Sequence, residues 1–228
     1  GNDPIPLELI HAIACLKRMA AHTNHQLGVL DEQRCGWITE AAQEVERGEW
    51  DGEFPLSCWQ SGSGTQTNMN VNEVIANRAC ELAGKPRGSR EVVHPNDHVN
   101  RSQSTNDVFP CAIHLAAERQ QRQALLPALR QLVNTLQSKA TAWADVVKIG
   151  RTHLQDAVPL TVGQEVGGWA AQLKSAAERL EQGLVELRSI PLGGTAVGTG
   201  LGAPKGYPEA VCEQLGDCEG VEWRSDGN

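Results

Sequence analysis

The chain has 228 residues, with 20 lysines and arginines against 28 aspartates and glutamates, so its formal net charge is −8. A surface of this sign excludes a protein that holds nucleic acid through bulk positive charge. No apolar run approaches the roughly 20 residues that a membrane-spanning helix needs, and the N-terminus lacks the basic flank and apolar stretch of a secretory signal. We therefore expect neither a nucleic-acid partner nor a membrane partner.

The first half of the sequence predicts three helices of ordinary length. Apolar residues recur three or four positions apart over residues 9–20, 35–45 and 71–82. Asp31 is the expected N-cap of the second helix, and Gly84 is expected to end the third. Aromatic residues make up only 4% of the chain, so the core must consist mainly of aliphatic side chains. This composition favours packed helices over a β-sandwich.

Two longer apolar patterns follow in the second half, over residues 125–147 and 162–187. Each keeps a strict alternation of three and four residues over several turns, which predicts the antiparallel members of a long helical bundle. Thr161 and Gln164 have the spacing of a capping box at the start of the second pattern. We expect a long helix on each side of the polar segment between them.

Prolines and glycines interrupt this second half. Pro110 is expected in the first turn of the first long helical segment, and Pro127 is expected to kink it. The glycine-rich run 193–202 follows a helix rather than a strand, and Lys205 is not followed by Ser or Thr. This context excludes a nucleotide-binding loop and predicts a closely packed turn between helices.

Seven cysteines are dispersed along the chain without a C-x-x-C pair. The spacing argues against a disulfide framework or a zinc ribbon and predicts small buried side chains in a reducing compartment. Their positions are 15, 35, 58, 80, 111, 212 and 218.

Three polar loops, at residues 62–68, 94–107 and 150–156, each precede a predicted helix. Hydroxyls, amides and free backbone N–H groups at helix N-termini are what an anionic ligand requires. Any one of these loops is more often only a helix cap. Three in one chain favour a binding function.

Histidines in two of these loops suggest further chemistry. His153 lies where an imidazole can move a proton near neutral pH, although a single histidine is more often structural. His94 and His98 have the i,i+4 spacing of metal ligands, but no third ligand is evident and Pro95 interrupts the helix. We therefore expect no metal.

Long strings of residues in these segments, in order, resemble the class II fumarate hydratases of the fumarase/aspartase superfamily. The matching segments are 59–70, 72–78, 94–100, 102–107, 148–156 and 193–201. The resemblance extends to about Gly216, and residues 217–228 do not look like the family.

The resemblance implies a mainly α fold. Residues 1–105 would form an N-terminal helical domain whose start is missing, and residues 106–228 the first long helices of a central bundle whose remainder is missing. It also implies reversible hydration of fumarate to (S)-malate in the tricarboxylic acid cycle, without metal or organic cofactor. The family forms homotetramers in which three chains build each active site. The implied location is the cytoplasm, with the mitochondrial matrix as the alternative.

The resemblance also assigns residue roles. His153 matches the catalytic histidine that works with the active-site water as proton donor or acceptor. The segments matched to substrate binding are Ser63, Gly64 and Thr65, then Ser104, Thr105 and Asn106, and finally Thr152. The segment matched to a secondary dicarboxylate site is His94, Pro95, Asn96 and Asp97.

Two alternatives remain. Aspartate ammonia-lyases resemble the same segments but usually carry Gln in place of His153; Thr105 and residues 157–159 lean weakly toward them. The family's mobile loop, of the type Gly-Ser-Ser-x-Met-Pro-x-Lys-x-Asn, carries the catalytic serine and is not found in these 228 residues. We therefore expect a fragment that is poorly stable and inactive alone, or else a helical interaction module without activity.

Overall fold

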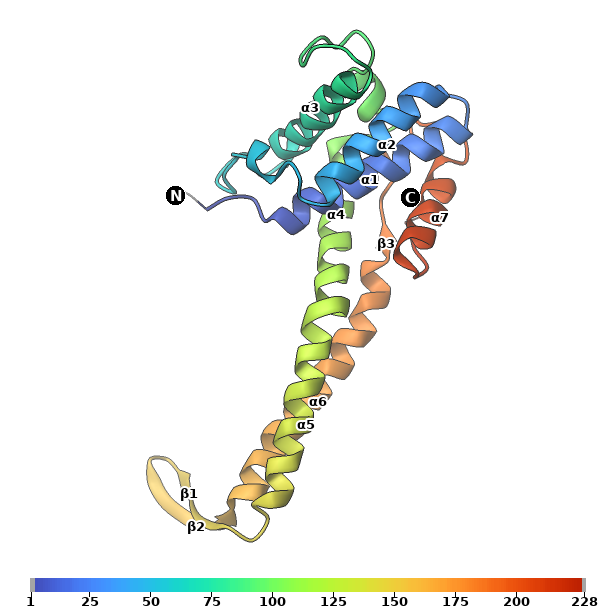
Figure 1. Ribbon diagram of the computed structural model, residues 1–228. Coiled ribbons are helices and arrows are strands. Elements are labelled where there is room, and N and C mark those ends of the chain that lie inside the picture. Colours follow the sequence, from blue (N-terminus) through green and yellow to red (C-terminus); the bar gives the residue numbers. More distant parts are fainter. Residues whose placement is uncertain (1–2, 227–228) are drawn as a thin grey trace. The chain divides into compact units, whose positions relative to one another are not determined.

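The computed structural model describes residues 3–226, and helices dominate it (Figure 1). The chain divides into two compact units. The first consists of Gly1–Ala117 and Leu187–Asn228, and the second of Glu118–Glu186. The predominance of helices confirms the predicted mainly α fold class. The predicted family domain boundary at residue 105 is a different division and stays a prediction.

The first unit begins with α1 (Leu7–Gln26), α2 (Glu32–Glu46) and α3 (Thr65–Leu82). Asp31 caps α2 as predicted, because its Oδ1 accepts a hydrogen bond from the Arg34 N–H at 2.9 Å. Helix α3 begins at Thr65, earlier than the apolar pattern indicates, because its first turns are polar. Short 3₁₀ and π turns follow α2 and α3 at η1 (Asp51–Glu53) and η2 (Pro95–Val99).

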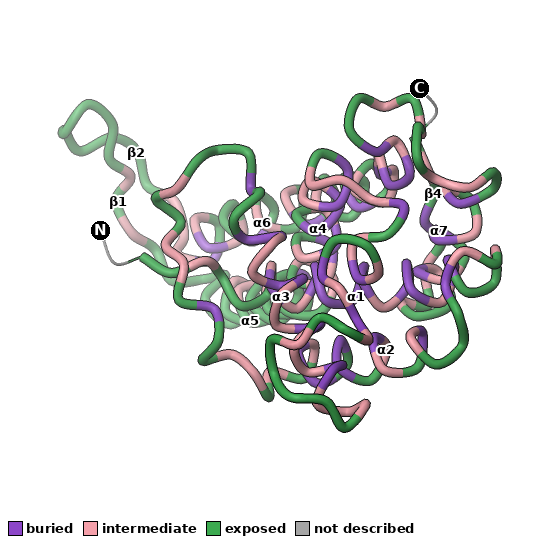
Figure 2. The backbone as a smooth tube through the Cα atoms, turned by 90° about the horizontal axis from the view of Figure 1, so that it is seen from above, coloured by how far each residue is buried: buried purple, intermediate pink, exposed green. Residues whose placement is uncertain are grey.

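Two further helices and two short strands belong to this unit. The helices are α4 (Thr105–Gln120), whose last three residues belong to the second unit, and α7 (Tyr207–Glu219). The strands β3 (Ser189–Ile190) and β4 (Arg224–Ser225) form a parallel pair. One continuous apolar core joins them to α1, α2 and α3. Its fully buried members include Ile13, Leu16, Ile38, Ile75, Leu115, Ile190 and Leu215. Figure 2 shows these buried stretches in purple. Burial of aliphatic side chains is the main force that holds the unit together.

The second unit is a pair of long antiparallel helices, α5 (Leu126–Ala142) and α6 (Val162–Leu187). A β-hairpin joins them, with β1 at Val147–Thr152 and β2 at Gln155–Thr161. The predicted capping box is confirmed by two reciprocal bonds. The Thr161 N–H donates to Gln164 Oε1 at 2.9 Å, and the Gln164 N–H donates to Thr161 Oγ1 at 3.0 Å.

Pro110 does not lie where it is predicted, whereas the helical segment is irregular just before Pro127. Pro110 lies inside α4 rather than in its first turn, because Ser104 rather than a later residue caps the helix. Pro127 lies in the first turn of α5, directly after the π turn η3 (Gln121–Leu125). A proline has no N–H to donate, so the turn before it loses a regular hydrogen bond, and a wider turn accommodates this loss.

Much of the apolar surface of the second unit is open. Trp169 is 51% exposed and Val185 54% exposed on α6, and Leu132 is 45% exposed on α5. Only a narrow seam between the helices, including Val166 and Ala177, is buried. Within residues 3–226, no helix combines the length and apolar character that crossing a bilayer requires.

Candidate functional site

The first polar loop ends at the N-terminus of α3. Gly64 is the N-cap with φ +72°, and a Cβ at this position would lie 2.5 Å from the Phe109 ring on α4. Both the left-handed backbone and the close approach therefore require glycine. Ser63 and Thr65 are exposed beside it, with their hydroxyl oxygens 3.2 Å apart. The loop thus presents two hydroxyls where α3 begins.

The second polar loop caps α4. Ser104 Oγ accepts from the Asn106 N–H at 3.2 Å, and the Ser104 N–H donates to Asp107 Oδ1 at 2.9 Å. Thr105 Oγ1 accepts from Asn68 Nδ2 at 2.9 Å, and this bond joins the second loop to α3. The structure therefore connects the predicted segment 104–106 to α3, the helix that begins directly after Gly64. Helix capping accounts for the hydrogen bonds of Ser104. The Asn106 side chain takes no part in the cap, and its Nδ2 donates to Ala196 O at 2.7 Å.

The glycine-rich run packs on this second loop. Asp107 is almost fully buried, and its Oδ2 accepts from the N–H groups of Gly193 at 3.2 Å and Thr195 at 2.9 Å. Burial raises the pKa of the Asp107 carboxyl, and the backbone N–H donors partly oppose this. The start of the run is closely packed as predicted, but its later part is not, because Val197 is 78% exposed and Leu201 85% exposed. The sequence did not predict that Asp107 would accept hydrogen bonds from the backbone of this run.

A buried lysine lies behind the two loops, and sequence reasoning missed it. Lys17 on α1 is 0% exposed, and its Nζ donates to Asn100 Oδ1 at 2.7 Å. Asn68 and Asn72 also donate to this oxygen, at 3.4 and 3.3 Å. Burial lowers the pKa of Lys17 to about 7, and the charge of Asp107 partly opposes the shift. A lysine inside the otherwise apolar face of residues 9–20 was the available signal.

An open pocket of about 380 Å³ lies between the second polar loop and the glycine-rich run. Its walls are mainly hydroxyls, amides and backbone, with one exposed leucine. The lining residues are Asn100, Ser102, Gln103, Ser104, Thr105, Thr195, Ala196, Leu201 and Gly202. Such a surface offers many hydrogen-bond donors and suits a small polar ligand.

Thr152 and His153 belong to the second unit and lie at the tip of the β1–β2 hairpin. His153 and Leu154 both have positive φ, at 47° and 62°, and form the two-residue turn between Thr152 and its strand partner Gln155. All four side chains are exposed. The expectation that this third loop stands at a helix N-terminus is wrong, because β2 separates it from α6. Alternating β-branched residues at 147, 149 and 158 were the missed signal.

The predicted secondary site forms a tight local turn. His94 Nδ1 accepts from the N–H groups of Asn96 and Asp97, each at 3.3 Å, and Pro95 begins η2. The His94 N–H in turn donates to His98 Nδ1 at 2.8 Å. Burial, followed by a nearby arginine, lowers the pKa of His98. Both Nδ1 atoms are thus used in local hydrogen bonds, while the Asp97 carboxylate is 73% exposed.

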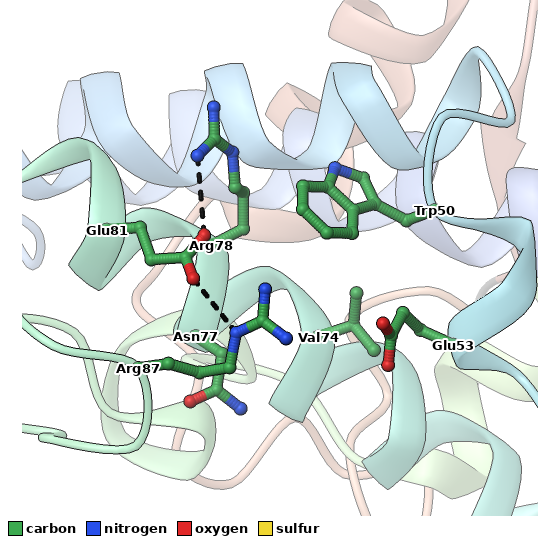
Figure 3. Close-up of a pocket in the computed structure, with 7 residues that line it drawn as sticks. All are labelled: Trp50, Glu53, Val74, Asn77, Arg78, Glu81 and Arg87. Atoms are coloured by element: carbon green, nitrogen blue, oxygen red, sulfur yellow. Dashed lines mark hydrogen bonds and ion pairs between the residues drawn. The ribbon is translucent and has the colours of Figure 1, made fainter.

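A smaller pocket of about 60 Å³ lies between α3 and the segment of Trp50 and η1, away from every predicted site residue (Figure 3). Arg78 pairs with Glu44 at 2.6 Å and with Glu81 at 3.4 Å, and Arg87 pairs with Glu81 at 2.9 Å. Both guanidinium carbons lie within 5.8 Å of the Trp50 ring centroid. Since carboxylates neutralise both cations, we interpret this cluster as a clamp between helices rather than as an anion site.

The helical fold with these capped polar loops is that of a known family of enzymes. The family model described as "Lyase" matches residues 3–227, and the chain belongs to this family. This match overturns the expectation that residues 217–228 depart from it. Within the described part of this segment, Trp223 packs into the core of the first unit and is only 5% exposed.

The chain is similar to several proteins named class II fumarate hydratase. It is 54% identical to that of Thermosynechococcus vestitus over 228 residues, which are all of this chain and 49% of the relative. It is 56% identical to that of Myxococcus xanthus over 220 residues, covering 96% of this chain and 47% of the relative. The resemblance seen in the sequence is confirmed. The chain spans about half the length of the curated relatives it matches.

Solved structures agree with this similarity. The class II fumarase of Schistosoma mansoni superposes with a TM-score of 0.91 at 46% identity, over 96% of this chain and 46% of that one. A fumarate lyase:delta crystallin of Brucella melitensis bound to cobalt gives 0.94 at 42% identity, over 100% of this chain and 50% of that one. None of these comparisons tests the predicted site residues, which stay predictions.

Proposed function

We propose that the protein to which this chain contributes is a fumarate hydratase, which interconverts fumarate and (S)-malate in the tricarboxylic acid cycle. The observation that carries the proposal is a polar pocket lined by Ser104 and Thr105 of one predicted substrate-binding segment, with Thr105 hydrogen-bonded to Asn68 in the first turn of α3. Residues 63–65 begin α3 and residues 104–106 begin α4. Similarity to proteins named class II fumarate hydratase supports the same activity.

The chemistry of these segments suits a dicarboxylate. Fumarate and malate carry two negative charges, and each carboxylate needs several hydrogen-bond donors when it leaves water. Hydroxyls, the Asn106 amide and helix N-terminal N–H groups supply such donors. When protonated, Lys17 adds a buried positive charge. Its Nζ donates to Asn100, which lines the pocket. This arrangement stabilises anionic substrate more than a neutral analogue.

His153 has the role of proton donor or acceptor in this proposal, acting with a water molecule. Its imidazole is exposed at the tip of a hairpin, so it is free to enter a site that other subunits complete. A composite site of this kind agrees with the homotetramer expected from the family. The open apolar faces of α5 and α6 are the surfaces that such an assembly would cover.

In the complete protein, residues 1–105 would belong to the N-terminal domain and residues 106–228 to the first part of the central bundle. The residues at 94–97 would form the secondary dicarboxylate site. The bacterial relatives support a cytoplasmic location.

The test is complementation. Because the family's serine loop is not found in these 228 residues, the chain alone is expected to show negligible turnover. We expect hydratase activity when it is produced together with the C-terminal half of the Thermosynechococcus relative, followed by the change in fumarate absorbance on addition of malate. The His153→Asn variant of the mixture should lose this activity by at least about a hundredfold, as removal of a general acid–base does.

Controls separate the alternatives. His25→Asn changes another exposed histidine and should leave turnover as it is. Release of ammonia from aspartate by the same mixture would identify an aspartate ammonia-lyase instead. A correctly assembled mixture without either activity would favour the helical interaction module, and robust turnover by the chain alone would contradict the need for the second half.

A further inference from the structure

Helices α1 and α7 place two cysteines beside each other in the first unit. The Sγ atoms of Cys15 and Cys218 lie within 4.8 Å of one another, and a carboxylate oxygen of Glu219 lies within the same distance of both. Cys15 is buried and Cys218 is exposed. These residues are far apart in the sequence and meet only because α7 packs against α1. The pair combines one thiol open to solvent with one that is shielded from it.

An arginine accompanies the exposed thiol. Arg18 Nη2 lies 3.2 Å from Cys218 Sγ, and the same nitrogen lies 2.9 Å from Glu46 Oε2 on α2, which holds the guanidinium in place. The pKa of Cys218 is lowered to about 6, chiefly by a hydrogen bond from Cys15; burial opposes this shift, and the hydrogen bond and charge of Arg18 add to it. On the same helix, burial raises the pKa of Cys212 to about 12. The surroundings of Cys218 therefore favour its thiolate form, whereas those of Cys212 oppose it.

We propose that Cys218 and Cys15 form a peroxide-sensitive thiol pair that closes to a disulfide between α7 and α1. In the first step, the Cys218 thiolate attacks one oxygen of hydrogen peroxide. The O–O bond breaks, Cys218 becomes a sulfenic acid, and the departing hydroxide takes a proton to become water. This step uses the exposed, ionised thiol as the nucleophile.

In the second step, Cys15 acts as the resolving thiol. Its sulfur attacks the Cys218 sulfur, the S–S bond forms, and the S–O bond breaks. The hydroxyl leaves with the Cys15 proton as a second water. The two thiols together lose two electrons, and the peroxide gains them. A small-molecule dithiol reverses the change.

The same three side chains could hold a soft metal ion, but Arg18 argues against it. A divalent cation bound by both sulfurs would stand close to a guanidinium that is already 3.2 Å from one of them. Like charges at that distance repel, and Arg18 cannot lose its proton to relieve the repulsion. The positive charge instead stabilises a thiolate, which is what reaction with peroxide requires.

The bond would fix α7 against α1, the helix that also carries Lys17. The glycine-rich segment that Asp107 holds lies directly before α7. Asp107 already holds the start of this segment, and the disulfide would restrain α7, which follows its end. The pocket-lining residues would stay chemically unchanged. We expect the oxidised protein to melt at a higher temperature than the reduced protein, because the disulfide closes a very long loop.

The test is peptide mapping after brief treatment of the purified protein with hydrogen peroxide, alkylation and proteolysis without reductant. We expect one cross-linked peptide pair containing Cys15 and Cys218, which disappears on addition of dithiothreitol. Cys218→Ser should remove it. Cys58→Ser is the matched control, because Cys58 is the other exposed cysteine, and this variant should keep the cross-link.

Two further measurements separate this proposal from its alternatives. In Cys15→Ala, Cys218 should persist as a sulfenic acid that dimedone captures. In Arg18→Gln, alkylation of Cys218 by iodoacetamide at neutral pH should slow by about tenfold, because the thiolate loses a cationic neighbour while Cys15 and Glu219 still face it. Failure of the parent protein to form the cross-link would overturn the proposal, and protection of both thiols by equimolar Zn²⁺ in that case would identify a metal site.

Discussion

The two units of the chain bury their apolar residues to very different degrees. In the first unit, Ile13, Ile38 and Ile75 are completely buried, and one core connects α1, α2, α3, α4 and α7. In the second unit, two helices cover only the seam between them, and Trp169 and Val185 remain more than half exposed. The apolar side chains of the first unit therefore pack mostly against one another, whereas the second unit has apolar faces against which further helices could pack.

The largest expected effect tests the first unit's core. Ile75→Ala should lower the free energy of unfolding by about 3 kcal/mol, because it leaves a cavity among fully buried neighbours. Trp169→Ala removes a larger side chain from the second unit but should change stability by less than about 0.5 kcal/mol in the chain alone, because that side chain is half exposed. Hydrogen exchange resolved to each unit measures both. Equal losses would contradict the contrast between the units.

The next effect concerns the buried charge in the first unit. The folded-state pKa of Lys17 is lowered from 10.5 to about 7, so the unfolded state binds more protons between these values. Stability should therefore rise with pH through this window, and the cost of burying the lysine is greatest below about pH 7. Lys17→Met should be more stable than the parent by about 2 kcal/mol at neutral pH.

The measurement for Lys17 is denaturant unfolding at a series of pH values. The difference between the parent and Lys17→Met should shrink toward high pH, because both then bury a neutral side chain. A difference that is constant from pH 7 to about 10 would show that Lys17 is not buried in its charged form. Lys139→Met on the exposed side of α5 is the control, and its effect should not depend on pH in this way.

The smallest effect tests local structure in the second unit. Thr161→Ala removes the hydroxyl that accepts from the Gln164 N–H and should cost about 1 kcal/mol of local stability. Faster amide exchange in the first turn of α6 would report it. Thr135→Ala is the control, since the Thr135 hydroxyl only bonds back to Gln131 O within α5. If both variants exchange alike, the capping box does not stabilise α6.

Structural features that depend on neighbouring residues were the easiest to predict from the sequence. The start of α6 at Val162 follows from Thr161 and Gln164, because a capping box involves residues only three positions apart. The start of α3 was harder to predict, because its first turns are polar and Gly64 is an unusual cap. The hairpin around His153 was missed because its apolar alternation is short and lies between two strong helical patterns.

The sequence by itself determined the helical fold class and the family, and it predicted which segments bind a dicarboxylate. Each of these depends on neighbouring residues or on long matched strings. Only the tertiary structure decided that Asp107 holds the glycine-rich segment, that Lys17 is buried behind the pocket, and that Cys15 meets Cys218. These contacts join residues far apart in the chain, and their partners are selected by how whole helices pack, which no local pattern records.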